Sequence, residues 1–224
     1  MSGIEDEREK ILEVIRRGSP FSIPEVSLVR VNNFVSEYLH WASRIHLVSR
    51  RDPPSSLATQ IVESIHMLDF AENLLPAREG EPCRVADVGT GYGFPGLVWS
   101  LLREELAMTL IERKDKCVSF LEMMIPRLGV GGVVVVKANA GRADIPQRFD
   151  LVTTKAAGRL SEVLPIAASL IRGSGLYVTI KEVAWEWEME AVDPGEMTLI
   201  STRDLPGKTG VLLAFGKGGQ AGPQ

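Results

Sequence analysis

The chain begins with three stretches in which hydrophobic residues recur every three or four positions, the spacing of one face of an α-helix. This periodicity predicts helices over residues 5–17, 25–49 and 57–75. Pro76 ends the third stretch, since proline cannot continue a helix. A turn-rich segment with glycine and a second proline follows it, so residues 1–80 are expected to form an N-terminal helical region.

From Cys83 onward, short apolar runs alternate with amphipathic stretches. The unbroken run of four valines at 133–136 is typical of a strand covered on both faces. The pattern predicts strands at 84–88, 107–112, 132–137, 149–153, 175–181, 197–202 and 210–215, with helices at about 95–105, 115–128, 158–172 and 183–190. The last two strands lack a convincing helix between them, which indicates a hairpin-like end to a mostly parallel sheet. We therefore predict a seven-stranded α/β domain over residues 81–216 and a disordered tail over 217–224.

The most specific motif follows the first of these strands. It reads Asp87-Val-Gly-Thr-Gly-Tyr-Gly-Phe-Pro-Gly96, with Pro95 at the expected helix start. Strand, glycine turn and helix together open a nucleotide-binding βαβ unit. So many glycines at one strand end lack a packing reason, and they favour a close approach between backbone and ligand.

Two cofactors compete for this turn. The spacing from Gly91 to Gly96 matches the dinucleotide fingerprint, and Glu112 follows about 20 residues later, as that fingerprint requires. However, the first glycine of the fingerprint should follow the strand directly. Here Gly89 does so, and counting from it puts Phe94 where the third glycine should be.

Charge and hydrogen bonding favour the other cofactor, S-adenosylmethionine. A pyrophosphate needs free N–H groups at the helix start, but Pro95 removes one and Asp87 adds a negative charge. S-adenosylmethionine has no phosphate and carries a sulfonium and an ammonium group. The motif also resembles the first motif of class I methyltransferases. The residues predicted to bind the cofactor in this segment are Asp87, Gly89, Gly91, Gly93 and Phe94.

Composition narrows the remaining classes of protein. Hydrophobic residues make up 45% of the 224, enough for a substantial core, and no apolar run approaches the length of a membrane span. The charged, acidic N-terminus does not resemble a signal peptide. Cys83 and Cys117 have no histidine at metal-ligand spacing, so we expect reduced thiols, no metal and a cytoplasmic protein. The net charge of −4 argues against nucleic-acid binding over the whole surface but allows a local basic patch.

The carboxyl ends of the other strands supply further candidates, because ligands of open α/β sheets bind there. Glu112 ends the second strand, where a carboxylate can accept hydrogen bonds from both ribose hydroxyls. The alternative is an exposed acid that begins a helix. The loop after the third strand contains Ala143 and Asp144, expected to contact the adenine. Lys155 ends the fourth strand and faces the expected site of methyl transfer, which makes it the candidate catalytic residue and a further predicted cofactor contact.

Over roughly residues 30–185 the chain resembles the glucose-inhibited division protein B family, methyltransferases that form 7-methylguanosine in small-subunit (16S) ribosomal RNA. The Phe-Pro-Gly ending of the glycine motif is specific to that family. Further matches are WASRIHLVSRRDP (41–53), LIERKDKCVSF (110–120), Arg142-Ala-Asp144 and the segment 150–156. The resemblance implies a Rossmann-like class I methyltransferase fold with an N-terminal helical extension, S-adenosylmethionine as cofactor, and ribosomal RNA or the small ribosomal subunit as partner.

The chain departs from the family mainly at positions expected near the substrate. The family's His-x-x-Asp-Ser is Gln60 to Ser64 here, with Glu63 in place of the aspartate. Lys155 stands in this chain where the family's Ser-Arg-Ala motif has arginine. After the fifth strand, Lys181-Glu182 stands where the family has Lys-Gly. Lysine keeps the charge of arginine but not its planar fork, so a forked contact would be lost. These departures leave open a changed substrate.

The expected chemistry requires no general base. Guanine N7 has an exposed lone pair and no proton to remove, so positioning in line with the sulfonium methyl group is sufficient. No catalytic histidine is therefore expected. His46 is the one exception that we leave undecided, because it replaces a family asparagine. RNA contacts are predicted from Arg50, Arg51, Arg159, Lys181 and, by base stacking, Tyr92. Trp185 and Trp187 are stacking candidates if they are exposed.

Three functions are consistent with the sequence. The first is a methyltransferase acting on small-subunit ribosomal RNA, the second a methyltransferase with another RNA or a small molecule as substrate. The third is a non-catalytic scaffold that binds the cofactor. A basic cofactor mouth would favour the first, a closed apolar mouth the second, and a blocked cofactor pocket the third. The oligomeric state is open, with a monomer favoured.

Overall fold

A computed structural model describes residues 2–45, 54–76, 80–143, 145–156, 158–182, 184–190, 192, 197–207 and 210–217. The chain starts with the helices α1 (Ser2–Gly18), α2 (Glu25–Ile45) and α3 (Pro54–Glu72). All three agree with the helices predicted from periodicity. The end of the second predicted helix, part of the segment 76–82 and most of the predicted disordered tail lie outside the described residues.

A seven-stranded sheet follows, in the order β3-β2-β1-β4-β5-β7-β6. Its strands are β1 (Arg84–Val88), β2 (Ala107–Glu112), β3 (Val133–Lys137), β4 (Phe149–Lys155), β5 (Ile171–Glu182), β6 (Met197–Asp204) and β7 (Gly210–Lys217). β7 runs antiparallel to both β5 and β6, while the pairs from β3 across to β5 are parallel. This confirms the predicted mostly parallel sheet with a reversed end.

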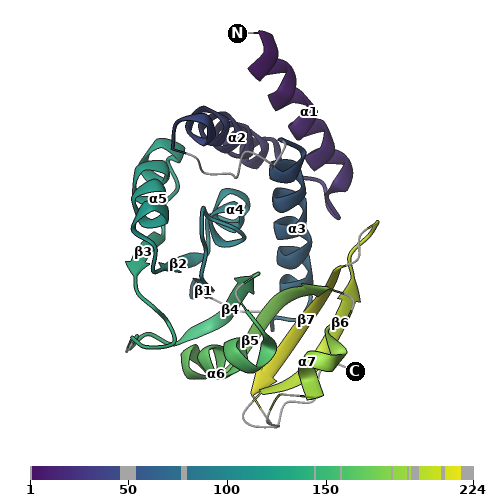
Figure 1. The fold of residues 1–224 in the computed structure, drawn as a ribbon, viewed down its shortest axis with the longest axis vertical. Coiled ribbons are helices and arrows are strands. Elements are labelled where there is room, and N and C mark those ends of the chain that lie inside the picture. Colours follow the sequence, from purple (N-terminus) through teal and green to yellow (C-terminus); the bar gives the residue numbers. More distant parts are fainter. Residues whose placement is uncertain are drawn as a thin grey trace.

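Four helices connect the strands: α4 (Gly96–Leu102), α5 (Asp115–Leu128), α6 (Leu160–Leu170) and α7 (Glu186–Glu190). In Figure 1, α2 to α5 lie on one side of the sheet and α6 lies on the other. The predicted helix 158–172 is too long, because Ile171 already pairs with Phe149 and starts β5. α7 is also shorter than the predicted 183–190. No helix in the described ranges is long and apolar enough to cross a membrane.

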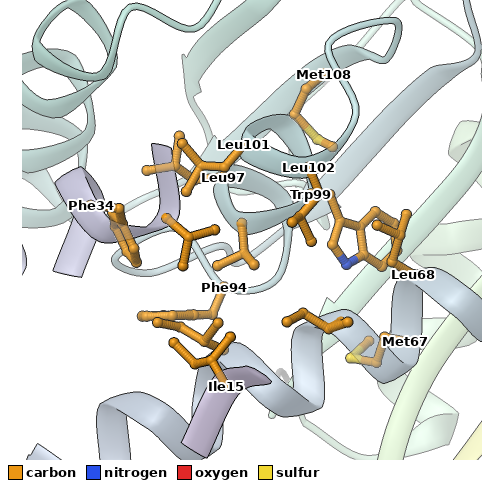
Figure 2. Close-up of a cluster of buried hydrophobic side chains, with 14 of the residues drawn as sticks. Ile15, Phe34, Met67, Leu68, Phe94, Leu97, Trp99, Leu101, Leu102 and Met108 are labelled. Atoms are coloured by element: carbon orange, nitrogen blue, oxygen red, sulfur yellow. The ribbon is translucent and has the colours of Figure 1, made fainter. Parts of the chain in front are cut away.

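The N-terminal helices share one hydrophobic core with the sheet. Figure 2 shows Ile15 of α1 and Phe34 of α2 beside Phe94, with Met67 and Leu68 of α3 near Trp99. The Trp99 indole N–H donates a hydrogen bond to the Ser64 carbonyl oxygen at 2.7 Å. These contacts fix α3 against the sheet, and they bring polar residues of α3 to the carboxyl end of β4. A second cluster, centred on α6, fills the opposite face.

Candidate active site

A cavity of about 330 Å³ opens at the carboxyl ends of the parallel strands. It adjoins the boundary between β1 and β4, where the strand order reverses direction, which is the usual ligand position in such sheets. Its walls come from the ends of β1, β2 and β4, the loop after β3 and one face of α6. The lining includes Val88, Gly89, Ile111, Glu112, Asn139, Gly141, Thr154, Ala156 and Ile166.

The glycine turn forms one wall through its backbone. The Gly89 N–H donates to the Ile111 carbonyl oxygen at 2.8 Å, which ties the turn to the end of β2. Gly91 has φ +57°, a left-handed conformation that glycine adopts without steric cost. Its N–H donates to Glu112 Oε2 at 2.9 Å. The turn is therefore tied to the end of β2 by hydrogen bonds to the Ile111 backbone and to the Glu112 side chain.

Glu112 lines the cavity and also supports the glycine turn. Its other oxygen, Oε1, accepts hydrogen bonds from the backbone N–H groups of Arg113 at 2.8 Å and Lys114 at 2.9 Å. Only 5% of the residue is exposed. A carboxylate offers about four acceptor positions, so three bonds to the backbone leave capacity for a ligand hydroxyl. The sequence indicated the ligand role, but not this contact with Gly91.

Asp87 lies fully buried behind the turn. Its Oδ2 accepts a hydrogen bond from the Gly96 N–H at 2.8 Å, whereas Oδ1 has no partner among the described residues. Burial raises the pKa of Asp87 to about 7, against the lowering effects of the nearby Thr90 hydroxyl, the Gly96 N–H and the charge of Lys155. A side chain at Gly96 would collide with Asp87, since its Cβ would lie 2.8 Å from Oδ2. Glycine is thus required here for the approach of α4 to β1.

The start of α4 has no N–H group left for a phosphate. The Gly96 N–H is bonded to Asp87, and the N–H groups of Gly93 and Phe94 donate to the Thr90 carbonyl oxygen. Leu97 N–H donates to the Gly93 carbonyl oxygen. Pyrophosphate binding at a helix start depends on such donors, so this site does not suit a dinucleotide. Buried carboxylates at the same place, one with an unpaired oxygen, suit the positively charged groups of S-adenosylmethionine.

The remaining predicted cofactor residues occupy different positions. Phe94 packs its ring against Phe34 and Tyr38, with ring centres 5.8 and 5.9 Å away, so its side chain belongs to the core. A side chain on Gly93 would likewise point toward Leu97 of the core. Ala143 is exposed and does not line the cavity, and Asp144 lies outside the described residues. Contact with the cofactor stays a prediction for these positions.

Asn139 and Thr154 line the cavity but were not singled out from the sequence. Asn139 Oδ1 accepts a hydrogen bond from the Gly141 N–H at 3.3 Å, which shapes the loop after β3. Thr154 lies beneath the cavity and bonds the Tyr177 hydroxyl at 2.6 Å. Asn139 could have been predicted from the sequence, because it lies two residues after the end of a strand. The contact of Thr154 could not, because its partner Tyr177 lies on a different strand.

Lys155 lies at the end of β4, as predicted, but its charge is already paired. Its Nζ is 3.1 Å from Glu63 Oε2 of α3, and their side chains are only 12% and 17% exposed. The ammonium also lies 5.9 Å from the centre of the Phe94 ring. Lys155 therefore connects the helical region to the strand end instead of projecting freely into the cofactor cavity.

Of the five residues predicted to contact RNA, the structure describes Tyr92, Arg159 and Lys181, and each of them contacts other residues of the protein. Tyr92 packs edge-on against Phe120, with ring centres 5.3 Å apart. Lys181 Nζ donates to the Gly158 carbonyl oxygen at 2.5 Å and to Glu188 Oε2 at 2.8 Å. Arg159 is exposed, with its guanidinium 5.9 Å from the centre of the Trp187 ring. Arg50, Arg51 and His46 lie outside the described residues.

No group of three or more potential metal-ligating His, Cys, Asp or Glu side chains occurs in the described part of the chain. Both cysteines there are free thiols, with Cys117 buried and Cys83 half-buried. Burial also raises the pKa of the Cys117 thiol. Cys117 is thus a core residue on the buried face of α5.

The solved structures with a similar fold are methyltransferases. One is a ribosomal protein L11 methylase from Lactobacillus delbrueckii subsp. bulgaricus, with a TM-score of 0.56 at 16% identity over 71% of this chain and 79% of that one. Another is an O-methyltransferase from Thermotoga maritima, described as dependent on S-adenosylmethionine, with a TM-score of 0.51 at 11% identity over 68% and 64%. At these identities the similarity shows the fold.

Sequence similarity identifies the family. Ribosomal RNA small subunit methyltransferase G of Sorangium cellulosum is 28% identical over 86% of this chain and 81% of its own length. The protein of the same name from Syntrophus aciditrophicus is 28% identical over 76% and 70%. The model of the GidB family, described as rRNA small subunit methyltransferase G, matches residues 28–204. The chain therefore belongs to the GidB family.

Proposed function

We propose that this protein transfers a methyl group from S-adenosylmethionine to N7 of a guanine in small-subunit ribosomal RNA. The observation that carries the proposal is the match to the family model over residues 28–204, which spans both the helical region and the strand ends around the cavity. The cavity, its carboxylates and the absence of free N–H groups at the start of α4 support the choice of cofactor. The proposed substrate also implies a cytoplasmic protein.

The cofactor supplies an electrophilic methyl group on a positively charged sulfur. Around it, Glu112 is proposed to accept hydrogen bonds from the ribose hydroxyls, and the loop at Asn139 to contact the adenine. Gly89 and Gly91 allow the backbone to approach the ligand closely. Asp87 places a buried carboxyl group behind the turn, and its ionised form favours a cationic ligand over an anionic one.

The chain's contribution to the reaction is positioning. Guanine N7 attacks with its own lone pair, so no residue has to remove a proton. Lys155 is proposed to help place the base at the end of β4, where Glu63 restrains its ammonium group. Because this lysine is paired, we propose a role in shaping the site and in balancing its charge, and no role as an acid or base.

The test is a map of 7-methylguanosine in small-subunit RNA from cells with and without the gene. Loss of one specific modification, restored by the wild-type gene but not by a Glu112→Ala variant, would support the proposal. Purified protein should transfer labelled methyl groups to unmodified small subunits or their RNA. An unchanged modification map, combined with methylation of a different RNA or of a small molecule in vitro, would replace the proposed substrate.

A further inference from the structure

A second cavity, of about 430 Å³, adjoins the cofactor cavity. Ala156, which follows the last residue of β4, lines both of them. The second cavity is bounded by Glu63, Lys155, Glu182, Trp185, Trp187 and Glu188, among others. The two cavities therefore lie next to each other at the end of β4.

The charges of this cavity do not suit a phosphate. Both of its lysines are bound within the protein, Lys155 to Glu63 and Lys181 to Glu188 and to the Gly158 carbonyl oxygen. Each lysine side chain is only 12% exposed. Three glutamates face these two lysines, so the lining carries a net negative charge. A neutral group, or one that becomes positive, fits this lining better than an anion does.

The cavity also presents a flat aromatic surface. Trp187 lies on α7 with 53% of its surface exposed, although a large apolar side chain is normally buried. Exposed aromatic rings beside a cavity stack on unpaired nucleobases. Trp185, half-buried in the same lining, extends this apolar wall.

One glutamate of the lining, Glu182, is available to bind a ligand. Glu63 is paired with Lys155, and Glu188 accepts hydrogen bonds from Lys181 and from the Leu160 N–H. Glu182, at the end of β5, is exposed and its side chain makes no hydrogen bond or ion pair within the described ranges. A carboxylate is an acceptor-only group with two oxygens. It can therefore bind two neighbouring N–H donors side by side.

We propose that the second cavity receives the target guanine, turned out of the RNA, with Trp187 stacked on the ring and Glu182 bound to its N1–H and N2–H groups. Those donors lie on the edge of guanine opposite N7, so this orientation turns N7 away from Glu182 and toward Ala156 and the cofactor cavity. Adenine has only one donor, its amino group, on the corresponding edge, and its N1 lone pair would face the second carboxylate oxygen. This assignment rests on the proposed function. It adds the cavity in which the guanine binds and the residue that distinguishes guanine from adenine.

The charge of the lining also fits the reaction. The N7 lone pair forms the new N–CH3 bond, while the S–CH3 bond breaks and its electrons pass to sulfur. No proton moves, and the positive charge passes from the sulfonium group to the guanine. A net negative lining around the base stabilises the charge that develops there.

α7 is held in place by contacts that do not involve the proposed ligand. Glu188 accepts hydrogen bonds from Lys181 and, at 2.7 Å, from the backbone N–H of Leu160 at the start of α6. Although burial acts in the opposite direction, these bonds hold the pKa of Glu188 below its ordinary value. Trp187 is therefore presented by an anchored helix, and its truncation should leave α7 in position.

The test compares wild-type protein with Trp187→Ala, Trp187→Phe, Glu182→Gln and a control, Glu186→Gln, on methyl transfer to unmodified small subunits. Glu186 is exposed on the same helix and does not line the cavity. Trp187→Ala and Glu182→Gln should each lower kcat/KM by about tenfold or more, the effect of losing a stacking or hydrogen-bonding partner. Trp187→Phe should retain most of the activity, Glu186→Gln all of it, and cofactor affinity should stay unchanged throughout.

A binding measurement separates this inference from the proposed function. In protein saturated with S-adenosylhomocysteine, 7-methylguanosine should quench the fluorescence of wild-type protein, and Trp187→Phe should show a much smaller response, which comes from Trp185 in the same lining. Quenching without methylation of small-subunit RNA would retain the base site and reject the ribosomal substrate. Wild-type rates in both Trp187→Ala and Glu182→Gln, or equal quenching in wild-type protein and Trp187→Phe, would overturn the assignment.

Discussion

Lys155 at the end of β4 and Glu63 on α3 form an ion pair, with Nζ and Oε2 3.1 Å apart and both side chains largely shielded from water. The pair joins the N-terminal helices to the strand end between the two cavities. Solvent screens it weakly, so the attraction between its charges exceeds that of a surface pair. Removing one partner leaves the other charge partly buried and without this contact.

Truncating either partner should therefore reduce stability. We expect Lys155→Ala and Glu63→Ala each to lower the free energy of unfolding by about 1–3 kcal/mol, and the double variant to lose less than the sum. Urea denaturation of the four proteins measures this coupling. The pair Glu13–Arg17 on α1 is a control, because its side chains are 57% and 80% exposed. Additive losses at Lys155 and Glu63 would mean that their contact contributes nothing.

The ion pair also predicts how substitutions of Lys155 change the rate of methyl transfer. Lys155→Arg keeps the charge beside Glu63, so it should keep most of the methyl transfer to small-subunit RNA. Lys155→Ala should reduce kcat more than it reduces cofactor affinity, since the lysine lines the second cavity and not the first. Steady-state rates and calorimetric dissociation constants for the three proteins provide the comparison. Equal rates would remove Lys155 from the substrate site.

Hydrophobic patterning was sufficient to predict the strands, because each buried strand is a short apolar run bounded by turn residues. The predicted strand 210–215, for example, is found as Gly210–Lys217. The position of the cofactor turn also followed from local sequence, since strand, glycines and helix are adjacent in the chain.

The pairing of charged side chains could not be predicted in this way. Glu63 and Lys155, or Lys181 and Glu188, meet only after the sheet and its covering helices have assembled. Lys181, for which contact with RNA stays a prediction, also binds Glu188 of α7. The unpaired Glu182 becomes recognisable as a candidate only when the partners of its neighbours are known.

Glu112 should affect both cofactor binding and the glycine turn. Glu112→Ala removes the expected ribose acceptor and should weaken binding of S-adenosylmethionine by about 1–3 kcal/mol. It also leaves the Gly91, Arg113 and Lys114 N–H groups without their acceptor, so a smaller loss of stability should accompany it. Calorimetry and thermal denaturation measure the two effects. Glu122→Ala, on the exposed face of α5, is the matched control, and an unchanged dissociation constant for Glu112→Ala would exclude the ligand role.

Gly96 should tolerate no side chain. In Gly96→Ala the new Cβ would lie 2.6 Å from Leu110 Cδ2 and 2.7 Å from Asp87 Cβ, so α4 or β1 must shift. We expect a loss of about 1–3 kcal/mol in the free energy of unfolding, with weaker cofactor binding. Gly131→Ala is the control, because its Cβ would meet no atom within 4 Å. Wild-type stability and affinity in Gly96→Ala would show that the turn does not depend on this close approach.

Asp87 should make the stability of the protein depend on pH near neutrality. Burial raises its pKa from 3.8 to about 7, so between these values the folded protein binds a proton that the unfolded chain has released. The free energy of unfolding should therefore fall as pH rises through this window and become constant above it.

Asp87→Asn keeps an oxygen for the Gly96 N–H but cannot ionise, so it should not show this fall. Relative to wild type, the variant should gain up to about 4 kcal/mol between pH 4 and pH 8, the free energy equivalent of three pKa units. Urea denaturation of both proteins at several pH values gives the difference directly. Asp6→Asn, at an exposed position on α1, controls for the loss of one carboxylate. A difference between wild type and Asp87→Asn that stays constant from pH 4 to pH 8 would mean that Asp87 titrates alike in the folded and unfolded chains, and that its burial does not raise its pKa.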